Sequence, residues 1–378
     1  MRVLLTGGKT AGHINPALAI AETVLQNDPT AEIQFVGVRG GKEEDLIPRE
    51  GFRLHFVQSM GIRRSLSPKN IRAVWLAIKS PRSKETQAIL DEFQPDIVIG
   101  TGGFTSWPIM KAAILRGIPT AVHESNALPG LTVRLLQRKV DRVWINFERT
   151  RELLRVKDST RVVKVGNPLR KDFGRLSQRE AKCRLGMEQT ALSVLSFGGS
   201  LGAEEVNTAV IRLMAESTSK MPNVLHFHAT GKRDWEASQK AFLEKGLQNC
   251  KNCTLVDYIY DMPIRMAAAD VIICRAGAMT LSELALMKKA AVLIPSPNVT
   301  DNHQYLNAKT LADRGAALLV EEASLEEGSL TKAVATLLQD EEKRMALGRE
   351  IEQFADRNAN RRIWEQILEL TEKSNQGK

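Results

Sequence analysis

Long apolar runs are the first thing that this sequence lacks. No segment of the 378 residues approaches the roughly 18–20 consecutive apolar residues that a membrane-spanning helix needs. The apolar part of the opening MRVLLTGG is also too short for a secretory signal and is typical of a buried strand. We therefore expect a protein that stays in the cytoplasm and touches a membrane only peripherally.

Metal-binding patterns are also scarce. The four cysteines include one CxxC, Cys250 and Cys253, with no second pair or histidine cluster nearby to complete a zinc set. No Asp-x-Asp pair occurs, although sugar transferases that hold a diphosphate through a metal commonly need one. The sequence therefore predicts no metal site and no cofactor.

Acidic residues are missing from one stretch of a chain whose net charge is +9. Between Gly51 and Lys84 there is no Asp or Glu, and one face of a predicted helix carries Ile71, Val74, Trp75 and Ile78. Such a basic amphipathic segment is typical of contact with an anionic membrane surface. An ordinary surface helix, with its apolar face packed on its own domain, explains the pattern equally well. The basic residues are Arg53, Arg63, Arg64, Lys69, Arg72, Lys79, Arg82 and Lys84.

Short apolar segments alternate with helical stretches along the chain, which is the pattern of parallel sheets with crossover helices. With 43% hydrophobic residues, the chain is long enough for two α/β domains, each with its own core. We predict one domain over residues 1–163 and another over 164–355, with a C-terminal helix in 356–378 that packs back on the first. The expected strands are Val3–Thr6, Ile33–Val38, Ile97–Ile99, Thr120–His123 and Val143–Ile145, then Leu192–Phe197, Leu225–His228, Val271–Cys274, Ala291–Ile294 and Ala317–Val320.

Glycine-rich turns follow several of these strands, where helix N-termini suit an anion such as a phosphate. The turn GGKTAGHINPA is not a P-loop, because Val3 stands where that motif needs its first glycine. It is not a dinucleotide fingerprint either, since the second strand ends at Val38-Arg39 without an acidic residue. We expect a helix to begin near Asn15-Pro16 with His13 at its mouth. His13 is then a candidate general base, or a histidine that only caps or packs the loop.

The segment from Cys274 to Ala308 has the features of half a nucleotide-sugar site. A strand enters a Gly/Ala turn, a helix carries the single acid Glu283, and a second strand opens into a loop with His303 and Gln304. A helix N-terminus suits a diphosphate, a carboxylate can accept bonds from a ribose diol, and amides can bind sugar hydroxyls. Arg170, in the sequence GNPLR, could clamp a phosphate.

These motifs resemble those of the bacterial peptidoglycan transferases of glycosyltransferase family 28, which add N-acetylglucosamine to an undecaprenyl-pyrophosphoryl-muramoyl-pentapeptide lipid. The resemblance covers nearly the whole chain through GGKTAGHINPALA, TGGFTSWP, HESNALPGLT, FGGSLGAEEVN, CRAGAMTLSE and NVTDNHQYLNA. It implies two Rossmann-like domains facing across a cleft, the B-type glycosyltransferase fold. It also implies an inverting transfer from UDP-N-acetylglucosamine at the cytoplasmic side of the cell membrane.

The resemblance assigns roles residue by residue. His13 would be the catalytic base for the acceptor's 4-hydroxyl. The donor would be bound by Arg170, Ser200, Ile259, Ala278, Met279, Thr280, Glu283, His303 and Gln304, with Glu283 on the ribose and Ile259 on uracil. The lipid acceptor would be bound by Thr10, Ala11, Gly12, Gly102, Gly103, Glu124 and Asn126.

Three positions depart from the family pattern, all of them on the acceptor side. Lys9 stands where a third glycine is usual, Phe104 where a tyrosine is common, and Val133 in place of an asparagine. The same implied fold also serves UDP-N-acetylglucosamine 2-epimerases and transferases to diacylglycerol, although an epimerase needs no membrane surface. His13 and Glu283 argue against a non-catalytic paralogue that binds UDP-sugar, whereas Lys9 leaves that alternative open. A nucleic-acid binder is disfavoured because no aromatic-rich basic sheet or recognition helix is present.

Overall fold

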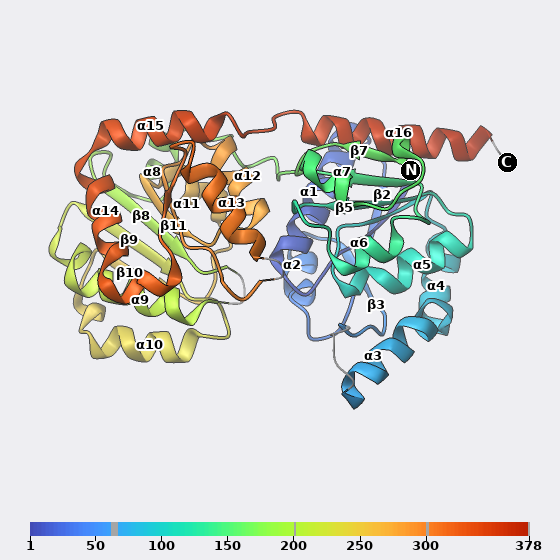
Figure 1. The fold of residues 1–378 in the computed structure, drawn as a ribbon, viewed down its shortest axis with the longest axis horizontal. Helices are drawn as coiled ribbons and strands as arrows, with labels where there is room; N and C mark the ends of the chain where they lie inside the picture. The colour runs from blue at the N-terminus through green and yellow to red at the C-terminus, as the bar shows by residue number, and fades with distance from the viewer. Residues whose placement is uncertain (62–66, 200–201, 300–301, 377–378) are drawn as a thin grey trace. The chain divides into compact units, whose positions relative to one another are not determined.

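The computed structural model describes residues 1–61, 67–199, 202–299 and 302–376 (Figure 1). Its contacts divide the chain into two compact units. Unit 1 contains Met1–Arg170 and Arg357–Lys378, and unit 2 contains Lys171–Asp356. The division therefore follows Arg170, whereas the sequence placed it after residue 163.

Unit 1 is built on a parallel sheet of seven strands in the order β3-β2-β1-β4-β5-β6-β7. The two edge strands β3 and β7 were not expected, because they are short and carry no continuous apolar run. The strands are β1 (Arg2–Thr6), β2 (Glu32–Gly37), β3 (Arg53–Phe56), β4 (Ile97–Gly100), β5 (Thr120–Glu124), β6 (Arg142–Ile145) and β7 (Val162–Lys164).

Helices cover both faces of this sheet. On one face α1 and α16 pack together, and Ile363, Ile367 and Leu370 of α16 enter the same apolar core as Leu5. The other face is covered by residues of α4, α5 and α6. The helices of unit 1 are α1 (Ala11–Asn27), α2 (Glu43–Arg49), α3 (Pro68–Lys79), α4 (Lys84–Phe93), α5 (Trp107–Leu115), α6 (Leu131–Leu136), α7 (Glu148–Leu153) and α16 (Ala359–Gln376).

Unit 2 is also an α/β unit, and it contains a six-stranded parallel sheet in the order β10-β9-β8-β11-β12-β13. Its strands are β8 (Leu192–Phe197), β9 (Val224–Ala229), β10 (Cys253–Val256), β11 (Val271–Cys274), β12 (Ala291–Leu293) and β13 (Leu318–Leu319). Its helices are α8 (Gln178–Arg184), α9 (Glu204–Glu216), α10 (Trp235–Glu244), α11 (Met262–Ala268), α12 (Ala278–Leu286), α13 (His303–Ala312), α14 (Ser329–Gln339) and α15 (Glu341–Glu352).

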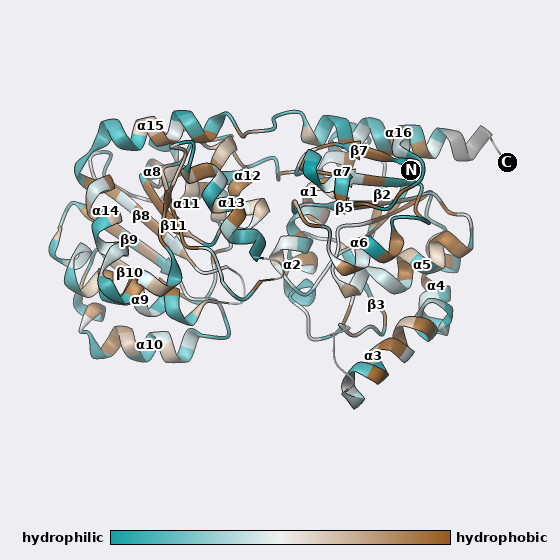
Figure 2. Ribbon diagram, viewed as in Figure 1, coloured by the Kyte–Doolittle hydropathy of each residue, from teal (hydrophilic) through white to brown (hydrophobic). Residues whose placement is uncertain are grey.

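The central strands of both sheets are buried and hydrophobic (Figure 2). Strands buried on both faces are typical of parallel sheets covered by helices, so the α/β class that the sequence predicted is confirmed. Because every strand pair is parallel, the carboxyl ends within each sheet meet at one edge. The glycine turns predicted from the sequence follow those ends, which is where open α/β sheets bind ligands.

Candidate functional site

In unit 1 the first two glycine loops interlock through Thr101. The Thr101 N–H donates to the Thr6 carbonyl at 2.8 Å, and its hydroxyl donates to the His13 carbonyl at 2.6 Å. The strands before these loops, β1 and β4, are neighbours in the sheet, which brings the loops together across 88 residues of chain. The structure therefore places Gly12, Gly102 and Gly103 at one edge of one sheet. Thr101, which locks them, was not singled out from the sequence.

His13 lies in the first turn of α1, which begins at Ala11 and not near Asn15-Pro16. Its Nδ1 lies 3.0 Å from the Thr101 carbonyl, and a carbonyl only accepts, so Nδ1 carries the proton. Burial lowers the pKa of the imidazole, and the positive charge of Lys9 lowers it further against the opposing bond to Thr101. His13 is therefore neutral near pH 7, with its lone pair on Nε2.

Gly102 and Gly103 are required by the tight contact between the loops. Both adopt positive φ, +102° and +78°. A Cβ at Gly102 would lie 2.8 Å from His13 Nδ1, and a Cβ at Gly103 would lie 3.0 Å from the Gly8 carbonyl oxygen. A side chain at either position would push the loops apart and displace His13.

Lys9, the main departure from the family pattern, adopts a φ of +72°. Glycine reaches this left-handed region without strain, which explains why a glycine is usual here and why lysine is unexpected. The Lys9 N–H donates to Glu43 Oε2 at 2.9 Å, and its ammonium lies 5.5 Å from the centre of the Phe104 ring. Two contacts therefore hold the strained residue in place.

Glu124 shapes its own loop. Its side chain is 4% exposed, and its carboxylate accepts from the N–H and the amide of Asn126 at 2.9 and 3.1 Å and from the Gly130 N–H at 2.8 Å. Burial raises the pKa of Glu124, and these hydrogen bonds oppose the rise. The next helix is tied back to the second glycine loop, because the Thr132 hydroxyl donates to the Gly103 carbonyl at 3.0 Å. The loops with Asn126, Gly103 and His13 thus form one connected group.

Arg170 lies in unit 1 and not in the second domain, where the sequence predicted it. Strand β7, just before it, extends the first sheet, and this keeps the following residues with unit 1. The guanidinium donates to Glu22 at 2.9 Å and to both carboxylate oxygens of Glu50 at 2.7 Å. In this conformation its donors are directed at two carboxylates.

In unit 2, Glu283 lies just over one turn into α12 and is 6% exposed. Burial raises the pKa of Glu283 to about 7. No hydrogen bond joins its carboxylate to another residue within the described ranges. Ala278, Met279 and Thr280 form the first turn of the same helix, at the positive end of its dipole. A buried carboxylate and a helix N-terminus therefore lie on one element, as the sequence predicted.

The loop after β12 is closed by Gln304, whose side-chain oxygen accepts from the Ser296 N–H at 3.0 Å. His303 is the first residue of α13, after Asn302 at a φ of +51°. Asn307, which sequence reasoning missed, donates to the Ala276 carbonyl at 3.3 Å and is buried. This contact ties α13 to the turn before α12, so His303 and Gln304 are held near the Glu283 helix.

Ile259 lies between β10 and α11, and its side chain is buried in the core with Phe197 and Cys274. Its backbone is the only part that the sequence assigned to a ligand. Ser200 lies outside the described residues. The glycine loop that contains it is tightly packed at its far end, since a Cβ at Gly202 would lie 2.5 Å from Asp234 Oδ2.

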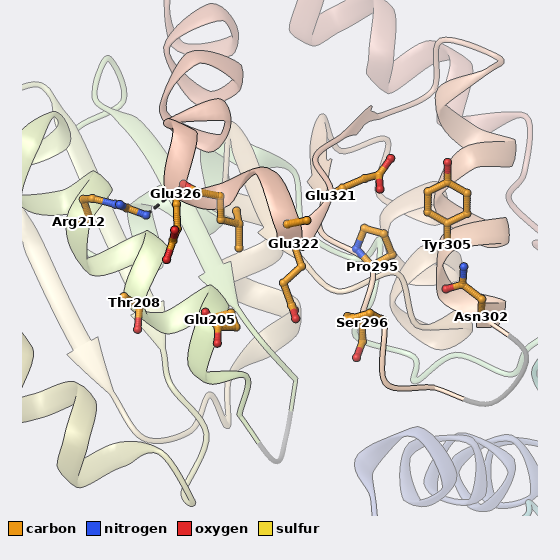
Figure 3. A pocket seen from close by; sticks show the side chains of 13 residues that line it. Glu205, Thr208, Arg212, Pro295, Ser296, Asn302, Tyr305, Glu321, Glu322 and Glu326 are labelled. Carbon is orange, nitrogen blue, oxygen red and sulfur yellow. Dashed lines mark hydrogen bonds between the residues drawn. The ribbon is translucent and has the colours of Figure 1, made fainter.

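A pocket of about 490 Å³ opens in unit 2 between α9, the loop after β12 and the segment after β13 (Figure 3). Among the residues that the structure describes, none of the predicted donor residues lines it. Its lining is rich in carboxylates, which disfavours a diphosphate there. The lining side chains labelled in Figure 3 are Glu205, Thr208, Arg212, Pro295, Ser296, Asn302, Tyr305, Glu321, Glu322 and Glu326.

Helix α3 leaves its apolar face uncovered. Ile71, Trp75 and Ile78 are 64%, 52% and 65% exposed, whereas Ala73 and Leu76 make the contacts with the unit. The alternative that the predicted face packs on its own domain is therefore wrong, because a different face does so. The Lys79 ammonium lies over the Trp75 ring at 4.4 Å. Among the described residues no helix combines the length and the hydropathy that a membrane span requires.

The chain matches two family models, the glycosyltransferase family 28 N-terminal domain over residues 3–145 and its C-terminal domain over residues 193–363. It is 38% identical, over 98% of both chains, to the UDP-N-acetylglucosamine–N-acetylmuramyl-(pentapeptide) pyrophosphoryl-undecaprenol N-acetylglucosamine transferase of Acetivibrio thermocellus. The protein of the same name from Exiguobacterium is 38% identical over 91% of this chain and 93% of its own.

Solved structures agree with these relatives. The crystal structure of Acinetobacter baumannii MurG aligns with a TM-score of 0.67 and 27% identity, over 97% of this chain and 99% of that one. A UDP-GlcNAc 2-epimerase from Neisseria meningitidis aligns with a TM-score of 0.63 over 98% and 100% of the chains. At 16% identity, the epimerase shows only a shared fold. The B-type glycosyltransferase fold predicted from the sequence is confirmed.

Proposed function

The chain belongs to the family of UDP-N-acetylglucosamine–N-acetylmuramyl-(pentapeptide) pyrophosphoryl-undecaprenol N-acetylglucosamine transferases, and from this membership we propose the reaction and the residues that carry it out. It is an N-acetylglucosaminyltransferase of peptidoglycan synthesis. It transfers N-acetylglucosamine from UDP-N-acetylglucosamine to the 4-hydroxyl of the undecaprenyl-pyrophosphoryl-N-acetylmuramoyl-pentapeptide acceptor, and the anomeric centre is inverted. The identity of 38% over 98% of the chain carries this conclusion.

His13 is the proposed general base. With the proton on Nδ1 and burial lowering the pKa, its Nε2 is available to take the proton from the attacking hydroxyl. The new bond forms from that oxygen to the anomeric carbon as the bond to the UDP oxygen breaks. Attack from the face opposite UDP gives the β-1,4 linkage.

The donor is proposed to bind at the carboxyl edge of the unit 2 sheet. Glu283 accepts from the ribose hydroxyls, Ala278, Met279 and Thr280 present the α12 N-terminus to the diphosphate, and His303 and Gln304 bind the sugar. Ser200 and Arg170 complete the diphosphate contacts, and the Ile259 backbone meets uracil. For this role Arg170 must give up its bonds to Glu22 and Glu50.

The acceptor is proposed to bind at the carboxyl edge of the unit 1 sheet. Thr10, Ala11, Gly12, Gly102 and Gly103 surround its diphosphate, with Asn126 beside them and Glu124 keeping that loop in shape. The two hydrogen bonds between His13 and Thr101 support the proposal, because they tie the first turn of α1 to the loop that contains Gly102 and Gly103.

We also propose peripheral attachment to an anionic membrane surface on the cytoplasmic side. The exposed face of α3 supplies apolar contacts and Arg72 and Lys79 supply charge, while Arg63 and Arg64 lie outside the described residues. A lipid-linked acceptor gives such attachment a purpose, because its pyrophosphate lies at the membrane surface.

The activity is tested by incubating the protein with radiolabelled UDP-N-acetylglucosamine and a short-chain analogue of the lipid acceptor. We expect label in the lipid product only when both substrates are present. Two controls address the alternatives, namely donor alone, analysed for the 2-epimer, and donor with diacylglycerol. Labelled 2-epimer in the first control, or labelled glycosyl-diacylglycerol in the second, would refute the proposed reaction if the lipid-linked muramyl product carries no label.

A further inference from the structure

Glu43 is a fully buried acid behind the first glycine loop, and sequence reasoning did not assign it a role. It is the first residue of α2, and its carboxylate accepts from two backbone groups far apart in the chain. Oε2 accepts from the Lys9 N–H at 2.9 Å, and Oε1 accepts from the Val38 N–H at 3.1 Å. One side chain therefore joins the loop after β1 to the loop after β2.

Three glycines make room for this carboxylate. A Cβ at Gly8 would lie 2.3 Å from Oε1, a Cβ at Gly41 would lie 2.2 Å from Oε2, and a Cβ at Gly37 would lie 2.6 Å from Glu43 Cγ. None of the three adopts a positive φ. They are therefore needed for the space that Glu43 occupies and not for their backbone conformation.

The hydrogen bond from the Lys9 N–H to Glu43 holds a strained part of the first glycine loop in place. Lys9 is a non-glycine residue at a φ of +72°, a conformation that persists only where the surroundings impose it. The Glu43 oxygen that accepts from the Lys9 N–H is part of a fully buried side chain, which is also held by the Val38 N–H. Lys9 directly precedes Thr10, the N-cap residue of α1, and His13 lies in the first turn of that helix.

We infer that Glu43 is a positioning residue for the acceptor site, which through the Lys9 N–H sets the conformation of residues 7–12 and so the place of His13. This inference rests on the proposed function, in which that loop surrounds the acceptor diphosphate. Glu43 itself is buried and touches no substrate. We expect its effect on the acceptor side, because its partner Lys9 directly precedes the proposed acceptor-binding residues Thr10, Ala11 and Gly12.

The first test is Glu43→Gln, which keeps the size of the side chain but replaces one accepting oxygen by a donor. We expect kcat/KM for the lipid acceptor to fall about 10- to 100-fold, the range that displaced reacting groups produce, while KM for UDP-N-acetylglucosamine stays within about twofold. Glu43→Asp, which keeps the charge, should recover part of the loss. The matched control is Glu44→Gln, on the same turn, whose exposed carboxylate accepts from the Gly40 N–H at 2.7 Å.

A steric test separates positioning from general stability. Gly41→Ala should impair acceptor turnover in the natural protein, because the added methyl group meets the Glu43 carboxylate. In a Glu43→Ala background the same change should have no further effect, since the space is then empty. Additive losses from the two substitutions would overturn the steric link between Gly41 and Glu43.

Hydrogen exchange at the Lys9 amide gives a readout that does not need turnover. It should be faster in Glu43→Gln than in the natural protein and unchanged in Glu44→Gln. A natural protein without transferase activity would refute the proposed function, and the exchange rates would still decide the positioning role. Unchanged exchange in Glu43→Gln, or equal losses toward donor and acceptor, would overturn the inference.

Discussion

At the scale of single residues, the proposed reaction depends on which ring nitrogen of His13 carries the proton. The Thr101 carbonyl holds it on Nδ1, which leaves Nε2 as the base. Removal of a general base typically costs roughly 10²–10⁴-fold in rate, so His13→Ala should lower kcat by about that factor. The acid limb of the pH–rate profile should disappear with it, because the titrating group is gone. UDP affinity, measured by calorimetry, should not change, because UDP is proposed to bind unit 2.

His13→Asn distinguishes the base from a loop-shaping residue. An asparagine side chain can still donate to a carbonyl such as that of Thr101, but it cannot take a proton at neutral pH. We therefore expect the Asn variant to be nearly as slow as the Ala variant. A rate close to that of the natural protein would show that His13 only shapes the turn.

Glu283 should make donor binding depend on pH. Its pKa of about 7 means that its carboxylate is half protonated near neutrality, whereas the ribose hydroxyls need an accepting carboxylate. UDP affinity should therefore rise between about pH 6 and pH 8, with release of a proton. Calorimetry in buffers of different ionisation enthalpy measures that proton. In Glu283→Gln the pH dependence should vanish and the affinity should be weak throughout; retained tight binding would remove Glu283 from the ribose contact.

The Glu283 carboxyl should also make the free energy of unfolding depend on pH. This stability should fall as pH rises, whereas UDP affinity should increase. Because its pKa is raised on folding, the native state binds more protons than the unfolded state between about pH 4.5 and pH 7, and stability falls as pH rises through that interval. The shift corresponds to roughly 3 kcal/mol at pH 8. Glu283→Gln should therefore be more resistant to urea than the natural protein at pH 8 and not at pH 4. If the urea midpoint of Glu283→Gln at pH 8 were equal to or lower than that of the natural protein, the predicted cost of burying the Glu283 charge would be wrong.

At the scale of elements, α3 is the helix whose surroundings the sequence left open. Its N-terminus is capped by Ser67, and it is anchored where the Trp107 indole donates to the Ala77 carbonyl at 2.6 Å. The helix is thus held firmly while Ile71, Trp75 and Ile78 remain exposed. Figure 1 shows α3 at the periphery of unit 1, beyond α4. An exposed apolar face on a fixed helix is typical of an interaction surface.

Vesicle binding tests this surface. Anionic vesicles should bind the protein, and binding should weaken as salt rises, because charges are screened within about 10 Å at 0.1 M ionic strength. Replacing Trp75 and Ile78 by Ser should weaken binding without loss of stability, since both side chains are exposed. The matched control is Leu243→Ser, an exposed apolar residue on α10 of unit 2, which should have no effect. Equal binding to neutral vesicles would contradict electrostatic attachment.

At the scale of the whole molecule, the chain is expected to neutralise the leaving diphosphate without a metal. The reason is the missing Asp-x-Asp pair together with the α12 N-terminus, Arg170 and hydroxyl donors. Turnover should therefore persist in excess EDTA. Loss of activity that added Mg²⁺ restores would show that a cation takes part. Thermal unfolding with and without EDTA controls for a structural effect of the chelator.

The sequence by itself determined the α/β class, the central strands and the glycine turns after them. These depend on local patterns, namely buried apolar runs and turn residues, which act over a few neighbouring positions. The errors in the predicted strands and helix starts also came from reading short stretches of sequence. Strands β3 and β7 lack a long apolar run, and these strands and β10 were not predicted. Helix α1 begins at Ala11 although the Thr10 side chain makes no capping hydrogen bond, whereas Pro16 suggested a later start.

Only the tertiary structure decided which side chains meet. Thr101 lies 88 residues from His13, Glu43 lies 34 residues from Lys9, and Arg170 lies 148 residues from Glu22. No local pattern specifies such pairs, because they form only when the strands and helices of unit 1 pack together. The same reason applies to α3, whose sequence fitted a packed face and an exposed face equally well until the other elements of unit 1 were in place.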